Sequence, residues 1–143
     1  MIVETLPVGM IQTNAYVVGD EKTKDGVVID PGGNPERILA AVERHGLTIR
    51  YILNTHAHFD HTEANGALVD ATGAPLAIHP LDRPLLEAAG GAALFGLRAE
   101  AGPAPDIALA DGDVLEVGSL HFQVMHTPGH TPGHVCFYEA HAG

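Results

Sequence analysis

The chain has no tryptophan, a single cysteine and only seven lysine and arginine residues among its 143 residues. One cysteine, Cys136, cannot form a disulfide within the chain, and because it lies in the apolar run 135–138 we expect it in the core. The 18 acidic residues give a net charge of −11. Without a cluster of basic residues, the chain lacks the electrostatic signature of a protein that binds nucleic acid or an anionic membrane surface.

Long hydrophobic runs are also missing. No apolar run approaches the roughly 20 residues of a membrane-spanning helix, and residues 1–4 lack the basic flank and apolar stretch of a signal peptide. Together with the single cysteine, this favours a cytoplasmic protein. Charged residues make up only 17% of the chain and hydrophobic residues 45%, which argues against disorder and suits one folded domain.

Short apolar runs bounded by turn residues predict strands, which cover residues 2–7, 15–18, 26–29, 49–54, 76–79, 114–117, 120–126 and 135–139. Helical spacing predicts helices, which cover residues 35–45, 62–71 and 84–89, with Asn34 and Thr62 as N-caps. Residues 88–105 are rich in Ala, Gly and Pro and predict a mobile loop near a site entrance. The fold class is therefore α/β or α+β, with a mixed β-sheet flanked by helices.

The most informative segment is residues 56–61, which read His-Ala-His-Phe-Asp-His. Imidazole nitrogens and carboxylate oxygens are the ligands that bind zinc and similar metals. The segment lies between a predicted strand and a predicted helix, where a rigid scaffold can direct several side chains at one point. A surface loop with chance histidines is the alternative, but ligand-type residues seldom gather at such spacing without a metal to bind.

A second segment, residues 126–134, reads His-Thr-Pro-Gly-His-Thr-Pro-Gly-His and lies between two predicted strands. Proline fixes φ and glycine permits tight turns, so this loop is stiffly shaped. Stiffness suits a metal ligand, which must be held within a fraction of an ångström. Taken alone, the segment is also compatible with an ordinary turn that carries incidental histidines. Because the same chain also contains the segment 56–61, we interpret both segments as parts of a metal site.

Together the two segments resemble those of the metallo-β-lactamase superfamily, and more narrowly its glyoxalase II (hydroxyacylglutathione hydrolase) branch. Residues 14–18 (Asn-Ala-Tyr-Val-Val) and the Asp-Pro-Gly-Gly turn at 30–33 support this resemblance, which covers the whole chain. It implies an αβ/βα sandwich built from two similar halves. Residues 1–143 are then a metallo-β-lactamase-like domain that matches the first half and is truncated after the strand at 135–139.

The resemblance also implies a site. His56, His58 and His130 would hold a first metal ion, while Asp60 and His61 would begin the shell of a second. Zn²⁺ is the expected ion, with iron or manganese as alternatives. The remaining histidines are expected to be structural or surface residues: His45, His79, His121, His126, His134 and His141.

Two ligands of the family's second metal site, a bridging aspartate and a later histidine, have no counterpart in this chain. The first site retains three imidazoles, the pattern of a catalytic zinc site with one open position, whereas Asp60 and His61 alone are too few for tight binding. A half sandwich would leave an apolar sheet face uncovered. We therefore expect either a homodimer that completes the sandwich or a fragment of a longer protein.

By resemblance, the function is metal-dependent hydrolysis of a small-molecule thioester, such as a glutathione thioester, by a metal-bound hydroxide. Asp60 would bind metal and orient the nucleophile. One alternative is a non-catalytic or weakly active metal-binding half-domain that self-associates. Another is an iron-dependent sulfur (persulfide) dioxygenase, which the missing bridging aspartate disfavours. No feature specific to lactam substrates is visible.

Overall fold

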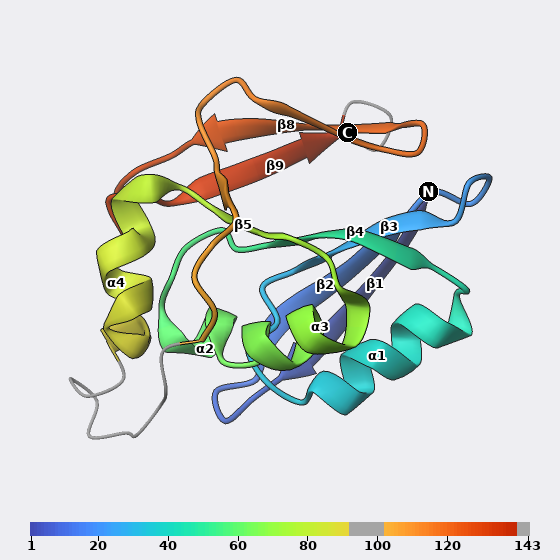
Figure 1. Cartoon of the computed structure of the whole chain (residues 1–143), viewed down its shortest axis with the longest axis horizontal. Coiled ribbons are helices and arrows are strands. Elements are labelled where there is room, and N and C mark those ends of the chain that lie inside the picture. Colours follow the sequence, from blue (N-terminus) through green and yellow to red (C-terminus); the bar gives the residue numbers. More distant parts are fainter. Residues whose placement is uncertain (92–101, 140–143) are drawn as a thin grey trace.

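The computed structural model describes residues 1–91 and 102–139, which form three layers: helices, a six-stranded sheet and a three-stranded sheet (Figure 1). This arrangement confirms the predicted α/β class. Most of the predicted loop 88–105 lies outside the described residues, as does His141, so their expected roles stay predictions. Within the described residues, no helix is long and apolar enough to cross a membrane.

The larger sheet is mixed and its strands lie in chain order. Its strands are β1 (Ile2–Val8), β2 (Thr13–Gly19), β3 (Asp25–Ile29), β4 (Thr48–Leu53), β5 (Leu76–Ile78) and β6 (Ile107–Ala108). The first three pair antiparallel, and β3 to β6 pair parallel. The two-residue β6 is too short to leave a pattern in the sequence. Because β3, β4 and β5 are parallel neighbours, the loops that follow them emerge at one edge.

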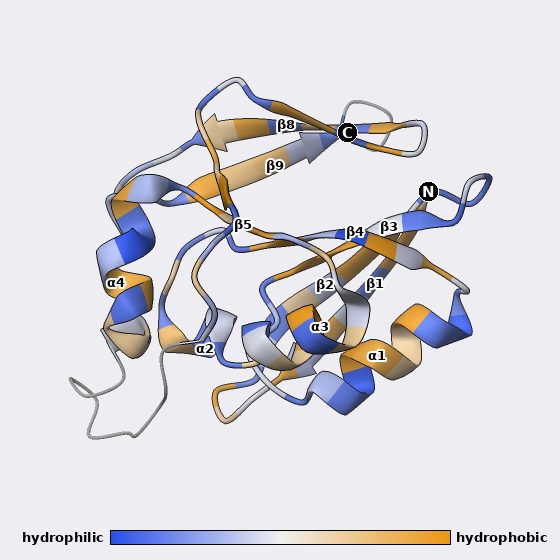
Figure 2. Cartoon of the chain, in the orientation of Figure 1, coloured by the Kyte–Doolittle hydropathy of each residue, from blue (hydrophilic) through white to orange (hydrophobic). Residues whose placement is uncertain are grey.

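The helices are α1 (Pro35–Arg44), α2 (Phe59–Thr62), α3 (Asn65–Thr72) and α4 (Arg83–Glu87), with a 3₁₀ turn, η1 (Pro80–Asp82), before α4. Figure 2 shows apolar and polar residues alternating around α1, whose apolar side packs on the sheet. Asn34 occupies the N-cap position of α1, as predicted, but its Oδ1 accepts from Gly9 N at 2.8 Å and makes no capping hydrogen bond.

The predicted helix 62–71 is wrong at its start, because α3 begins at Asn65 and Thr62 is the last residue of a separate short helix, α2. Thr62 ends α2, and its hydroxyl donates back to the His58 carbonyl at 3.3 Å instead of capping the helix that follows. The break has a tertiary cause. The Ala64 amide donates to the Pro31 carbonyl at 2.8 Å, so it does not bond within a continuous helix.

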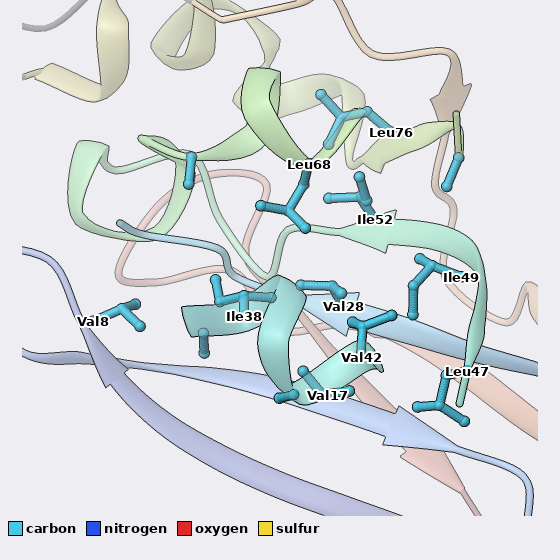
Figure 3. Close-up of a cluster of buried hydrophobic side chains, with 14 of the residues drawn as sticks. Val8, Val17, Val28, Ile38, Val42, Leu47, Ile49, Ile52, Leu68 and Leu76 are labelled. Carbon is cyan, nitrogen blue, oxygen red and sulfur yellow. The ribbon is translucent and has the colours of Figure 1, made fainter. Parts of the chain in front are cut away.

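Side chains on one face of the larger sheet pack against α1 and α3 and form the first core cluster (Figure 3). Side chains from β2 to β5 meet the apolar sides of the two helices in this cluster, which includes Val17, Val28, Ile38, Val42, Ile52, Leu68 and Leu76. Each of these residues is at least nine-tenths buried. Burial on this scale anchors the strands from which the loops at the sheet edge emerge.

The opposite face of the larger sheet is covered by the smaller sheet, whose antiparallel strands are β7 (Val114–Val117), β8 (Leu120–His126) and β9 (Val135–Glu139). A second core cluster fills the interface: Val18, Val27, Ile29, Leu53, Ala77, Leu109, Leu115, Val117, Leu120, Phe122, Val124 and Val135. The larger sheet is therefore buried on both faces, which explains the continuous apolar runs of β3 and β4.

The outer face of the smaller sheet carries Val114, Met125, Cys136 and Tyr138, and all four are exposed. The same face carries the polar residues Glu116, His121 and Gln123, and its identity as the uncovered face of a half sandwich stays a prediction. The expectation that Cys136 is a core residue is wrong. Side chains alternate along a strand, and Val135 faces the core, so its neighbour Cys136 points outward.

Candidate metal centre

Three segments that follow parallel strands meet at one edge of the larger sheet. Asp30 follows β3, the loop with His56 follows β4, and the 3₁₀ turn that ends at Asp82 follows β5. The loop 127–134 connects β8 and β9 and reaches the same edge, because the Val135 amide donates to the Thr55 carbonyl at 2.8 Å. The carboxyl ends of parallel strands are where α/β proteins place their sites.

His56, His58 and His130 lie together at this edge. Each offers one nitrogen, and these nitrogens all lie within 4.8 Å of one another. His58 Nδ1 and His130 Nε2 are only 3.0 Å apart. The fold therefore brings together three residues that the sequence predicted as ligands of one ion, although His130 is 72 positions from His58. Whether they bind metal stays a prediction.

The surroundings of His56 fix which of its nitrogens carries a lone pair. The Thr55 hydroxyl donates to Asp30 Oδ2 at 2.6 Å and lies 3.0 Å from His56 Nδ1. Because its one hydrogen goes to the carboxylate, the hydroxyl accepts from His56 Nδ1–H. The lone pair is then on Nε2, which is buried and has no hydrogen-bond partner in the described part of the chain. An unpaired buried acceptor costs about 1–3 kcal/mol, and a metal ion would satisfy it.

The pKa values of His56 and His58 also favour metal binding. Burial, followed by the nearby His61 and His134, lowers the pKa of His56 to about 3. Burial and the adjacent His130 also lower the pKa of His58. At neutral pH both rings are therefore uncharged, which is the form of imidazole that binds a metal.

Asp60 and His61 lie beside this group, with the rings of His56 and His61 4.0 Å apart. Asp60 Oδ2 accepts from the Thr13 hydroxyl at 2.9 Å and lies 3.3 Å from His61 Nε2. His61 Nδ1 donates to Asp30 Oδ2 at 3.0 Å. Burial opposes charge on His61, but the hydrogen bond to Asp30 and the charges of Asp30 and Asp60 outweigh it and raise its pKa. In this arrangement His61 is held between two carboxylates.

Two buried carboxylates that sequence reasoning missed support the histidines. Asp30, 2% exposed, accepts from the Thr55 amide and hydroxyl and from His61. Asp82, fully buried, accepts from Ala57, Thr131 and Gly133. Their place in the sequence could have identified them, since each carboxylate follows a buried strand that lies parallel to β4.

The other described histidines lie outside the three-residue group. His134 Nδ1 is 2.9 Å from the Thr127 hydroxyl, and His79 stacks on His126 with ring centroids 4.2 Å apart. His45 pairs with Glu4 at 2.7 Å, and His121 lies 3.7 Å from Glu116 on the outer face of the smaller sheet.

Comparison with known proteins agrees with this geometry. Residues 8–143 match the family described as the metallo-beta-lactamase superfamily. The chain is 34% identical to the hydroxyacylglutathione hydrolase GloC of Haemophilus influenzae, over 97% of this chain and 66% of that protein. It spans about two thirds of the length of the curated relatives it matches.

Two crystal structures are similar over 99% of this chain and 68% of theirs. The BLEG-1 B3 metallo-beta-lactamase superposes with a TM-score of 0.89 at 38% identity. TTHA1623, crystallised in a di-iron-bound form, superposes with a TM-score of 0.83 at 43% identity. With a family match over nearly its whole length, the chain belongs to the metallo-β-lactamase superfamily.

Proposed function

We propose that His56, His58 and His130 hold a divalent metal ion and that the protein is a hydrolase of small-molecule thioesters such as acylglutathiones. The observation that carries the metal proposal is the buried Nε2 of His56, which has no hydrogen-bond partner among residues 1–91 and 102–139 and lies beside two further imidazoles. The name of the Haemophilus relative, a hydroxyacylglutathione hydrolase, supports the substrate class.

Zn²⁺ is the proposed ion because three imidazoles with an open fourth position are typical of catalytic zinc sites. Imidazole also suits iron, and the similar TTHA1623 was crystallised with two irons. Iron and manganese therefore remain the alternatives. Asp60 and His61 are proposed to begin a second site, because Asp60 Oδ2 and His61 Nε2 lie 3.3 Å apart, a separation that suits two ligands of one ion.

The residues of the site have separate tasks in the proposed reaction. A bound Zn²⁺ lowers the pKa of a water molecule toward neutrality and polarises a carbonyl oxygen. His130 is exposed and His58 is partly exposed, so the group is open to a substrate on one side. Asp60, held by the Thr13 hydroxyl, is proposed to orient the attacking water and accept its proton at Oδ2.

Self-association is the second part of the proposal. The outer face of the smaller sheet exposes Val114, Met125 and Tyr138 by 54%, 43% and 44%. An open hollow of about 430 Å³ is lined mainly by apolar residues from both sheets, among them Tyr16 and Phe137. A second copy of the chain that covered this surface would remove apolar area from water.

The first experiment measures molar mass by light scattering and metal content on the same chromatographic peak, followed by hydrolysis of S-lactoylglutathione. We expect a metal-bearing dimer that cleaves the thioester. His56→Ala should abolish metal binding, whereas His121→Ala, an exposed histidine on the smaller sheet, should retain it. Unchanged metal stoichiometry in His56→Ala would show that the site is assigned wrongly.

The same samples separate the alternatives. Bound metal without turnover favours a non-catalytic half-domain. Iron with oxygen uptake favours a persulfide dioxygenase. Cleavage of a lactam such as nitrocefin in preference to the thioester would instead favour the activity named for BLEG-1.

A further inference from the structure

Asp82 is a carboxylate with no exposed surface at the end of η1. Its oxygens accept three hydrogen bonds. Oδ2 accepts from the Ala57 amide at 2.9 Å and the Thr131 hydroxyl at 2.7 Å, and Oδ1 accepts from the Gly133 amide at 2.6 Å. All three donors are neutral, and no lysine or arginine pairs with Asp82 in the described ranges 1–91 and 102–139. A buried charge is costly unless it is hydrogen-bonded and paired with an opposite charge, and a nearby cation would supply that charge here.

The three donors come from two different loops. Ala57 lies between His56 and His58, while Thr131 follows His130 directly in the chain. One side chain therefore joins the loop that carries two of the proposed ligands to the loop that carries the third. The backbone bond from Val135 to Thr55 joins the same two segments but does not involve a residue next to His58 or His130.

The sequence around Gly133 is adapted to this contact. A Cβ added at Gly133 would lie 2.6 Å from Asp82 N and 2.8 Å from Oδ1, closer than real Cβ contacts. Only glycine lets the loop backbone approach the carboxylate in this way. The second glycine of the repeated Thr-Pro-Gly-His sequence thus has a specific partner.

We propose that Asp82 is a positioning residue for the metal centre: it sets the spacing between His58 and His130 and supplies a buried negative charge that favours a divalent cation. A carboxylate suits both tasks, because it accepts from all three donors, whereas an asparagine amide would point a donor at one of them. The inference rests on the proposed metal site and deepens it.

A matched control exists at the other end of the smaller sheet. Asp20 is 4% exposed and also accepts three hydrogen bonds, from the Lys22 amide and from the amide and hydroxyl of Ser119. It joins two turns as Asp82 joins two loops. The seven residues of β8 lie between Ser119 and the histidine loop, a span of about 20 Å.

The test measures Zn²⁺ affinity by chelator competition and records the absorption spectrum of the Co²⁺-loaded protein. Asp82→Asn should weaken Zn²⁺ binding by about 10–100-fold and change the Co²⁺ bands, since supporting residues of metal sites have effects of that size. Asp20→Asn should change neither. Circular dichroism establishes that each variant is folded. Gly133→Ala, which pushes the loop off an intact carboxylate, should also weaken binding.

Unchanged affinity and spectrum in a folded Asp82→Asn variant would overturn the inference, as would an equal loss in Asp20→Asn. If Asp82→Asn does not fold, Gly133→Ala decides, and normal Zn²⁺ affinity in that variant overturns the inference. A wild-type chain that binds no Zn²⁺ refutes the proposed function itself, whereas tight wild-type binding with an insensitive Asp82→Asn refutes only the role of Asp82.

Discussion

The two histidine loops are built alike but are supported at different points. In each, a threonine hydroxyl donates to a buried aspartate: Thr55 to Asp30 in the loop after β4, and Thr131 to Asp82 in the loop between β8 and β9. In the first loop the hydroxyl also contacts the ring of His56. In the second, the carboxylate reaches only Thr131 and a backbone amide. The first loop therefore fixes the orientation and tautomer of a ligand, and the second fixes only its position.

The largest disruption of the first loop should come from Gly32→Ala. A Cβ at Gly32 would lie 1.7 Å from the Asp60 carbonyl oxygen, so the turn at 30–33 packs directly against the histidine loop. The methyl group must displace backbone, and we expect a loss of about 1–3 kcal/mol in the free energy of unfolding. Zn²⁺ affinity should fall at least tenfold. Urea denaturation and chelator competition measure the two effects.

The matched control is Gly66→Ala in α3. Among the described residues a Cβ there would meet Pro103 Cδ alone, at 3.5 Å, which is ordinary contact. Because alanine favours a helix over glycine, this variant should gain about 0.5–1 kcal/mol and bind Zn²⁺ normally. Equal behaviour of the two variants would mean that the turn does not support the histidine loop.

Much of the fold could be predicted because its signals are local. The apolar run within residues 49–54 and the alternation of apolar and polar residues in 120–126 mark strands wherever they pack. The break between α2 and α3 could not be predicted, because it depends on the bond from Ala64 to Pro31 in a distant turn. The exposure of Cys136 depends on which face of β9 meets the larger sheet, which an apolar run of four residues does not reveal.

The candidate site also contains some residues that could be predicted from the sequence and others that could not. His56, His58 and His130 were predicted because they occur in two dense segments with a known family pattern. Asp30 and Asp82 were not, because a carboxylate after a strand reads as a turn residue until its partners are known. Those partners are distant in the chain: Asp82 bonds Thr131, 49 positions away, and Asp30 bonds Thr55, 25 positions away.

Replacing each threonine by valine, which has the same shape without the hydroxyl, tests the comparison directly. Thr55→Val removes the acceptor for His56 Nδ1–H and frees the ring to change tautomer. We expect Zn²⁺ affinity to fall about 10–100-fold. Thr131→Val leaves Asp82 with two amide donors. Its main effect should be a loss of about 1–2 kcal/mol in stability, with a smaller change in affinity.

Chelator competition on both variants, with urea denaturation alongside, provides the measurement. Equal losses of affinity would mean that the second loop orients its ligand as strongly as the first. A larger loss in Thr131→Val would reverse the comparison.

The smallest expected effect is the change in protonation of His56 on acidification. An acid titration of the metal-free protein measures it and tests whether the first loop buries this ring. Burial, with His61 and His134 nearby, lowers the pKa of His56 to about 3, whereas an unfolded histidine titrates near about 6.5. Between these values only the unfolded chain binds the proton, so His56 makes the free energy of unfolding fall as pH drops below about 6.5.

His61 acts in the opposite sense: the hydrogen bond to Asp30 and the charges of Asp30 and Asp60 overcome its burial and raise its pKa. Its stabilisation is complete below about 6.5 and is lost as pH rises through that raised value. NMR titration of the ring protons at pH 5 should therefore find His56 neutral and His61 charged, and a His56 ring that titrates near 6.5 would place its lone pair in water and remove the main support for the metal site.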